Sequence, residues 1–377
     1  MSLPFALEFL APSYAGARIA CMEHLLGLSR ECIRHFTGRD PLAEPQHLNA
    51  IFRELTERLD IDLLWGGGLP ANNAATFDWA TGPRVRKNAA GEECIQWGIF
   101  ATTHQEDGRH FTGIPKPASV DAALALDPLA LFPDTIDQYT ERFTRQYARD
   151  LESCGDSAYP IPHHYTTCFH GPLALFGFEL LCEAGMEEDR FSTLMTRFAE
   201  ISRRVTTAWS RVRDPQGHRL QAFICHDDLT MTSGPLFSPA WYRRHIFPHY
   251  RAIFAPLQAA GIPVIFTSDG DPTAFIDDIL GESGANADGF NFEYLVDLQI
   301  LVDKYPNKIL IGNLNSGTLA RGPIAAIEAE LTRAIAIGKH APRFVINVGG
   351  GLTHDIPPAH LEAYLKLRKH LCRTARS

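Results

Sequence analysis

The stretch LQAFICHDDLTMTSGPLFSP, residues 220–239, decides the fold. Its apolar run ends at Cys225, and three polar residues follow. A helix start comes next, with Ser238 as N-cap and Pro239 at the first helical position. A buried strand, a polar loop and a helix in this order are typical of one βα unit of a parallel sheet. The stretch therefore predicts an α/β protein.

The same order of apolar run, polar break and helical segment recurs along the chain. Downstream predicted strands cover 262–266, 288–292, 308–311 and 343–347; upstream ones cover 161–169 and 61–65, the latter after an amphipathic helix over 47–59. No GxGxxG fingerprint follows any of these runs, which argues against a doubly wound dinucleotide-binding sheet. The pattern favours a (β/α)8 TIM barrel, although the sequence places only seven of its strands.

The domain prediction is one barrel domain over residues 46–377, preceded by a helical extension over residues 1–45. Alternating segments on either side of Gly91, at 84–87 and 94–102, predict an antiparallel β-hairpin. This hairpin belongs to an insertion over about residues 80–115, expected to cover the mouth of the barrel.

The net charge of -9 and a pI near 6.0 exclude a broad basic surface for nucleic acid or acidic lipid. The longest apolar stretches, such as 172–182, are too short to span a bilayer, and no signal peptide is recognisable. Eight cysteines occur without a CxxC or CxC pair, so neither a disulfide framework nor a thiolate zinc site is indicated. We therefore expect a cytoplasmic protein that binds small molecules or other proteins, with no nucleic acid or membrane among its partners.

Polar side chains just past the carboxyl ends of the strands line one pocket in a (β/α)8 barrel. The predicted catalytic residues with that placement are Asp227, Asp228, Asp269 and Glu293. The predicted substrate-binding residues are His163, His164, His226, Thr267, Asn313 and His354. Neighbouring side chains on a strand point in opposite directions, so one residue of each adjacent pair should face away from the pocket.

Carboxylates gathered in a dry pocket repel one another, and their pKa values move apart, which supplies both a proton donor and a base. A divalent metal ion would also relieve the repulsion. Its expected ligands are oxygen and imidazole groups, drawn from Asp269, Glu293, His226 and His354.

Four motifs within about the last 160 residues resemble those of the uroporphyrinogen decarboxylase (URO-D) superfamily. Asp227-Asp228-Leu229 with Gly234 to Pro239 resembles the DDLG…GPLxSP stretch, and PVIFTSDGD at 263–271 resembles PVxxHSxGD. Gly312-Asn313-Leu314 resembles the GN(L/V)D turn, and Asp355 to Pro358 the DxPP helix start. The resemblance implies a URO-D-like barrel, a homodimer, and either porphyrinogen decarboxylation or methyl transfer.

Several residues that distinguish the branches of this superfamily are replaced. The arginine-rich RQAGRY motif of true uroporphyrinogen decarboxylases is absent, and residues 66–70 lack the acid that follows their first strand. The histidine of their NLGHG turn falls on Gly350, and the tyrosine of their PFTLxxY helix on Phe178. The HxC and later Cys that bind zinc in thiol-activating methyltransferases fall on Thr267, Asp269 and Gly350.

These departures favour the branch that resembles the methyltransferases of O-demethylase systems. We expect removal of a one-carbon group from a small substrate, with aromatic compounds among the candidates, with Asp227 or Asp228 as the acid and with Asp269 and Glu293 as positioning groups. A reduced corrinoid on a partner protein would accept the methyl group, and no cofactor would be covalently bound. A decarboxylase of small acids and a non-catalytic binding protein of the same fold remain the alternatives.

Overall fold

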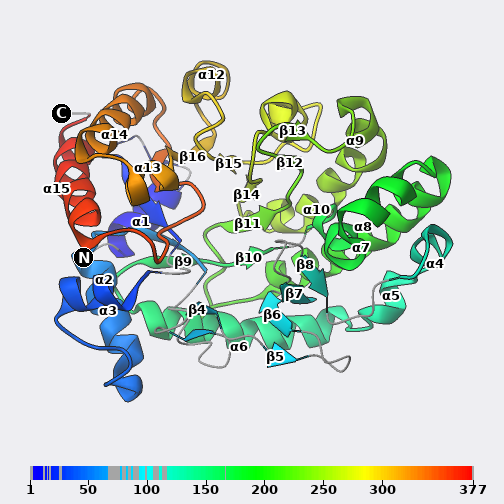
Figure 1. Cartoon of the computed structure of the whole chain (residues 1–377), viewed down its shortest axis with the longest axis horizontal. Helices are drawn as coiled ribbons and strands as arrows, with labels where there is room; N and C mark the ends of the chain where they lie inside the picture. Colours follow the sequence, from blue (N-terminus) through cyan, green and yellow to red (C-terminus); the bar gives the residue numbers. More distant parts are fainter. Residues whose placement is uncertain are drawn as a thin grey trace. The chain divides into compact units, whose positions relative to one another are not determined.

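The computed structural model describes residues 3–375 apart from 12, 15, 17, 25–27, 67–76, 79–81, 84–85, 88–92, 98–99, 105–109, 113–116 and 166. The chain forms two compact units. The first comprises Met1–Gly82, Gln146–Pro162 and Asp288–Ser377, and the second comprises Pro83–Arg145 and His163–Ala287. Both ends of the chain belong to the first unit (Figure 1).

The first unit is built on parallel strands. In spatial order they are β15 (Gly289–Asn291), β16 (Ile309–Leu314), β17 (Phe344–Val348), β1 (Ala20–Glu23), β2 (Leu63–Trp65) and β9 (Tyr159–Ile161). Its helices are α1 (Leu3–Leu10), α2 (Arg30–Thr37), α3 (Leu48–Arg58), α12 (Leu298–Lys304), α13 (Ser316–Arg321), α14 (Ile324–Gly338) and α15 (Pro358–Thr374), with the short 3-10 helix η1 (Pro45–His47). The strands predicted over 288–292, 308–311 and 343–347 are confirmed within a few residues.

Strand β1 corrects the predicted helical extension over residues 1–45. Ala20–Glu23 pairs in parallel with both β17 and β2, so it is a strand of the sheet, and the strand predicted as the first is the second. All four of its residues are buried. A short run that is buried on both faces shows no alternation of polar and apolar residues, so periodicity cannot identify it.

The second unit contains the parallel strands β10 (His163–His164), β11 (Phe223–His226) and β14 (Val264–Thr267), in that order. Its helices are α4 (Val120–Leu124), α5 (Pro128–Leu131), α7 (His170–Gly185), α8 (Glu188–Arg211), α9 (Pro239–His245), α10 (Phe247–Ala259) and α11 (Ile276–Leu280), with η3 (Thr273–Phe275) before α11 and the small β12 (Thr230–Met231) and β13 (Gly234–Pro235). Ser238 caps α9 and Pro239 opens it, as predicted.

The strand predicted over 161–169 is shorter than expected and is divided. It consists of β9 and β10 on either side of Pro162, and α7 already begins at His170. Pro162 has no N–H to donate to a ladder, and it stands between the end of β9 and the start of β10. Helix α6 (Ile136–Cys154) precedes β9.

The predicted insertion contains the strands β3 (Phe77–Asp78), β4 (Gly82–Pro83), β5 (Arg86–Lys87), β6 (Glu93–Trp97), β7 (Phe100–His104) and β8 (His110–Thr112). β5 and β6 pair in antiparallel fashion, as the hairpin prediction requires, and Gly91 itself lies outside the described residues. The segment predicted as one strand over 94–102 belongs to two strands, because β6 and β7 pair with each other in antiparallel fashion.

Along the chain, strands and helices alternate as they do in a (β/α)8 barrel, with β9 and β10 in one strand position. All four residues of β11 and of β14 are buried, as expected for parallel strands covered on both faces. Within the described residues, no helix is both long and apolar enough to cross a membrane.

Candidate functional site

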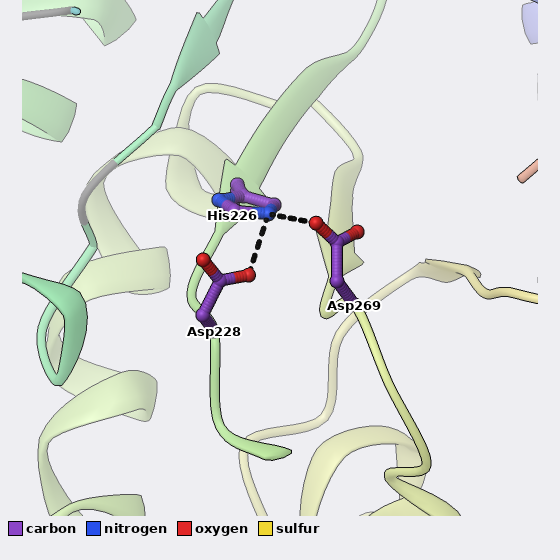
Figure 2. A group of neighbouring side chains, drawn as sticks. All are labelled: His226, Asp228 and Asp269. Atoms are coloured by element: carbon purple, nitrogen blue, oxygen red, sulfur yellow. Dashed lines mark ion pairs between the residues drawn. The ribbon is translucent and has the colours of Figure 1, made fainter. Parts of the chain in front are cut away.

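Three side chains meet at the carboxyl ends of β11 and β14 in the second unit. Figure 2 shows the carboxylates of Asp228 and Asp269 pointing toward the ring of His226. His226 Nε2 lies 3.1 Å from Asp228 Oδ1 and 3.8 Å from Asp269 Oδ2. His226 is buried, Asp228 is 24% exposed and Asp269 is 49% exposed. We call these three residues the His-Asp-Asp cluster; it has a buried imidazole base and a face open to solvent.

Asp227 has a different position from Asp228, because its carboxylate holds the start of α7. Its two oxygens accept hydrogen bonds from the backbone N–H groups of Cys168, Phe169 and His170 at 2.5–2.8 Å, and from the Tyr250 hydroxyl at 2.7 Å. Burial raises the pKa of Asp227, while these hydrogen bonds oppose that rise. A fully buried carboxylate with four donors caps a helix and is not available as a proton donor to substrate, so the prediction that allowed Asp227 as the acid is not supported.

The loop after β11 is tied to the loop after β14, which brings Asp228 and Asp269 to the same ring. The Thr230 hydroxyl donates to the backbone oxygen of Asp269 at 2.8 Å, and the Ser268 hydroxyl accepts from the N–H of Leu229 at 3.2 Å. Gly270 has φ +78°, and a Cβ there would lie 2.7 Å from the backbone oxygen of Met231. Only glycine allows these two loops to approach so closely.

Hydrogen bonding fixes the orientation of the His226 ring. Its Nδ1 lies 2.8 Å from the backbone oxygen of Tyr165. A carbonyl oxygen can only accept, so Nδ1 carries a proton and donates it, and Nε2 is the ring atom that faces the two carboxylates. Two negative groups around one ring nitrogen favour a positive centre there, either a second ring proton or a metal ion.

The pKa values follow from this arrangement. Burial, the largest single cause, lowers the pKa of His226, but Asp228, Tyr165 and Asp269 together outweigh burial and hold that pKa well above its usual value. Burial acts to raise the pKa of Asp228, but the imidazoles of His226 and His170 outweigh it and hold that pKa well below its usual range. Asp228 is therefore an anion at neutral pH, which does not support the predicted role of Asp228 as proton donor.

Two residues that the sequence reasoning missed complete the surroundings of the cluster. His170 Nδ1 lies 2.9 Å from Asp228 Oδ2, so Asp228 sits between two imidazoles. The Tyr165 ring stacks on His226 with centroids 4.3 Å apart, and meets His170 edge-on at 5.6 Å. The concentration of histidines in HHYTTCFH, residues 163–170, was the available signal. His170 escaped notice because it opens a helix rather than ending a strand.

The adjacent histidines of β10 face opposite ways, as the alternation rule predicts. His163 is the register partner of Ile224, two residues before His226, so it shares the face of His226. His164 turns away, and its Nε2 lies 3.2 Å from the Ser202 hydroxyl of α8. Burial is the main cause that lowers the pKa of His163 to about 4 and that of His164 to about 3, so both are neutral. His164 is therefore a packing residue and not a substrate ligand.

Thr267 is the register partner of His226, so its side chain lies on the same face beside the ring. It is 2% exposed, and its hydroxyl oxygen has no hydrogen-bond partner among the described residues. A buried hydroxyl without a partner is costly and is uncommon away from binding sites.

The remaining predicted residues, Glu293, Asn313 and His354, belong to the first unit. Glu293 follows β15 and is half-buried, beside the glycine turn that follows β17. The Asn313 amide donates to the backbone oxygen of Val296 at 3.0 Å, so it ties two segments together. His354 is exposed. Their predicted part in catalysis, substrate binding or metal binding stays a prediction.

The parallel strands, the alternating helices and a polar cluster at the strand ends define a barrel of the class that carries its active site at the carboxyl ends of its strands. Residues 194–371 match the family model for uroporphyrinogen decarboxylase (URO-D). The part of the chain over residues 194–371 thus carries a URO-D family domain. The predicted superfamily and the (β/α)8 fold class are thus confirmed.

Two relatives show the extent of the likeness. Uroporphyrinogen decarboxylase of Nocardia farcinica is 34% identical over 137 residues, 34% of this chain and 37% of the relative. The corresponding protein of Salinispora tropica is 30% identical over 173 residues, 46% of this chain and 43% of the relative. The matches thus span less than half the length of each relative.

Among solved structures, a methyltransferase from Methanosarcina mazei is similar with a TM-score of 0.58 at 14% identity, over 97% of this chain and 96% of that chain. At this identity the likeness concerns the fold.

Proposed function

We propose that this chain demethylates a small methyl ether, with an aryl methyl ether as the preferred substrate class, and passes the methyl group to a corrinoid protein. The observation that carries the proposal is the His-Asp-Asp cluster, in which the carboxylates of Asp228 and Asp269 lie 3.1 and 3.8 Å from His226 Nε2 and favour a positive charge on that nitrogen. An ether oxygen departs only if its developing negative charge is stabilised. A positive charge at His226 Nε2 would stabilise this negative charge, and the neighbouring ring of Tyr165 would lie beside the bound substrate.

The reaction balances as a simple displacement. The bond between the methyl carbon and the ether oxygen breaks, its electron pair stays on oxygen, and the oxygen takes a proton, from His226 Nε2 or from water, and leaves as the free phenol. A Co(I) corrinoid on the partner protein would supply the electron pair for the new carbon–cobalt bond, and cobalt would become formally Co(III). Asp228 and Asp269 hold the positive centre in place, and Asp227 fixes the neighbouring helix.

Decarboxylation of a small aromatic acid is the second candidate, because the matched relatives are uroporphyrinogen decarboxylases. In that reaction the cluster would protonate the carbon that loses carbon dioxide, and no cobalt would be needed. Two carboxylates beside the positive centre would repel an acidic substrate, which is why we place methyl transfer first.

The test combines the purified chain with chemically reduced cobalamin and a panel of aryl methyl ethers, beginning with 2-methoxyphenol. We expect methylcobalamin and the free phenol to form in equal amounts, and Asp228→Asn and Asp269→Asn to abolish turnover while circular dichroism stays unchanged. Asp271→Asn is the matched control, because Asp271 lies two residues from Asp269 but accepts from Thr273 of its own turn.

Other outcomes decide between the alternatives. Full activity in both Asp228→Asn and Asp269→Asn would reject the assignment of the site. Release of carbon dioxide from aromatic acids without cobalt would identify a decarboxylase. A tightly retained small molecule, identified by mass spectrometry, with no turnover of any substrate would identify a binding protein.

A further inference from the structure

We infer that the His-Asp-Asp cluster is the binding site of one divalent metal ion, held by His226 Nε2, Asp228 Oδ1 and Asp269 Oδ2. The inference rests on the proposed function and deepens it, because it replaces an unspecified positive centre by a Lewis acid. The three donor atoms all lie within 4.8 Å of one another. The set shares position 269 with the positions 267, 269 and 350 that correspond to the zinc ligands of thiol-activating methyltransferases. Its other two donors, His226 and Asp228, lie at and just past the end of β11 and are not among those positions.

The separations fit an ion with bonds of about 2.1 Å, for which neighbouring donors in an octahedral shell lie about 3 Å apart. The 3.1 Å between His226 Nε2 and Asp228 Oδ1 already has this value. Asp269 Oδ2 is 3.8 Å from the ring nitrogen, and its half-exposed side chain can close the remaining distance by rotation. One imidazole and two carboxylates are suited to Zn²⁺, Mn²⁺ or Fe²⁺.

The second layer of contacts orients the donors as metal sites require. The other ring nitrogen of His226 donates to a backbone carbonyl, which leaves the Nε2 lone pair directed at the cluster once its proton is lost. The other oxygen of Asp228 is 2.9 Å from His170 Nδ1. An imidazole anchored through its second nitrogen and a carboxylate anchored through its second oxygen are the usual supports of bound metal ions.

Two buried oxygens point to a ligand in addition to the three donors. Asp228 Oδ1 accepts no hydrogen bond of good geometry from the described residues, although an imidazole nitrogen is 3.1 Å away. The Thr267 hydroxyl, 2% exposed and on the face of His226, has no hydrogen-bond partner among them either. A metal ion would satisfy the first oxygen, and a water molecule on that ion would satisfy the second.

An ion at this position would leave coordination positions open on the solvent side, where Asp269 is half-exposed. A substrate oxygen bound there would be polarised, and the charge that develops on it would be neutralised without transfer of a proton. The metal would thus serve the proposed demethylation directly.

The experiment measures metal binding to the full chain after treatment with a chelator. Titration with Zn²⁺ in a calorimeter and with Co²⁺ in a spectrometer should show one equivalent bound per chain, with Co²⁺ giving the d–d bands of an imidazole–carboxylate site. Asp269→Asn and His226→Gln should lower the affinity by at least tenfold. His170→Asn should lower it by roughly 10- to 100-fold, as the loss of a group that orients a ligand does. Asp271→Asn should bind as the wild type does.

Equal affinity of the wild type, Asp269→Asn and His226→Gln would overturn the inference, since the ion would then lie elsewhere. Asp269 is half-exposed and its variant should fold, which keeps the test valid if His226→Gln does not. Full methyl transfer by the metal-free chain would also overturn the inference but would leave the proposed function standing. One bound ion that depends on the cluster, without methyl transfer, would support the metal site and reject the proposed function.

Discussion

Replacing Asp227 by asparagine separates the structural role that we assign to this residue from the role of a catalytic acid. Asp227 Oδ2 accepts three hydrogen bonds, from Cys168 N, Phe169 N and the Tyr250 hydroxyl, and Oδ1 accepts one from His170 N at 2.5 Å. In Asp227→Asn the amide oxygen can keep the three donors, but the amide NH₂ then faces the N–H of His170. The variant loses one hydrogen bond to a charged acceptor, which is worth about 1.5–3 kcal/mol. In addition, the amide NH₂ and the N–H of His170 are both donors and face each other without an acceptor between them.

We therefore expect Asp227→Asn to lower the free energy of unfolding by about 2–4 kcal/mol, while Asp271→Asn changes it by less than about 0.5 kcal/mol. Asp271 Oδ1 accepts from the N–H and the hydroxyl of Thr273 in a local turn, and the amide oxygen of asparagine can accept the same hydrogen bonds, so this position tolerates the change. The assay is urea unfolding followed by far-ultraviolet circular dichroism. Wild-type stability in Asp227→Asn, together with complete loss of turnover, would refute the reasoning and restore Asp227 as an acid.

Three further predictions concern the surroundings of the site and the core of the first unit. Gly270→Ala places a Cβ 2.7 Å from the backbone oxygen of Met231 at a φ of +78°, so we expect lower stability in urea and a loss of metal affinity of at least tenfold. His164→Ala breaks a buried hydrogen bond to α8, so thermal unfolding should shift down while turnover per folded enzyme stays unchanged. Burial raises the pKa of Glu23 from 4.5 to about 7. The folded state then keeps a proton that the unfolded state releases, so stability should fall as pH rises from about 4.5 to 7, and Glu23→Gln should flatten that fall in urea unfolding at pH 5 and pH 8.

The strand ends were predicted well because their signal is local. An apolar run that stops at a polar turn fixes where a strand ends, and the ends of β11 and β14 place His226, Asp228 and Asp269 at one edge without any knowledge of packing. Strand β1 carried no such signal, because four buried residues in a row look the same in a strand and in a helix.

The choice between adjacent residues needed the structure. The alternation of side chains along a strand predicts that Asp227 and Asp228 point in opposite directions. It does not predict which of the two faces the site, because that depends on where the start of α7 lies. The same holds for His163 and His164, where a hydroxyl on α8 determines which ring turns away. His170 is 56 residues from His226 in sequence, and only packing brings it to Asp228.

The sequence by itself determined the superfamily, the alternation of strands and helices, and the residue types at the strand ends, since these depend on local patterns of apolar and polar residues. Only the tertiary structure decided which charges meet. Protonation and metal affinity depend on distances of a few ångströms between side chains from separate segments, and no local pattern in the chain specifies such distances.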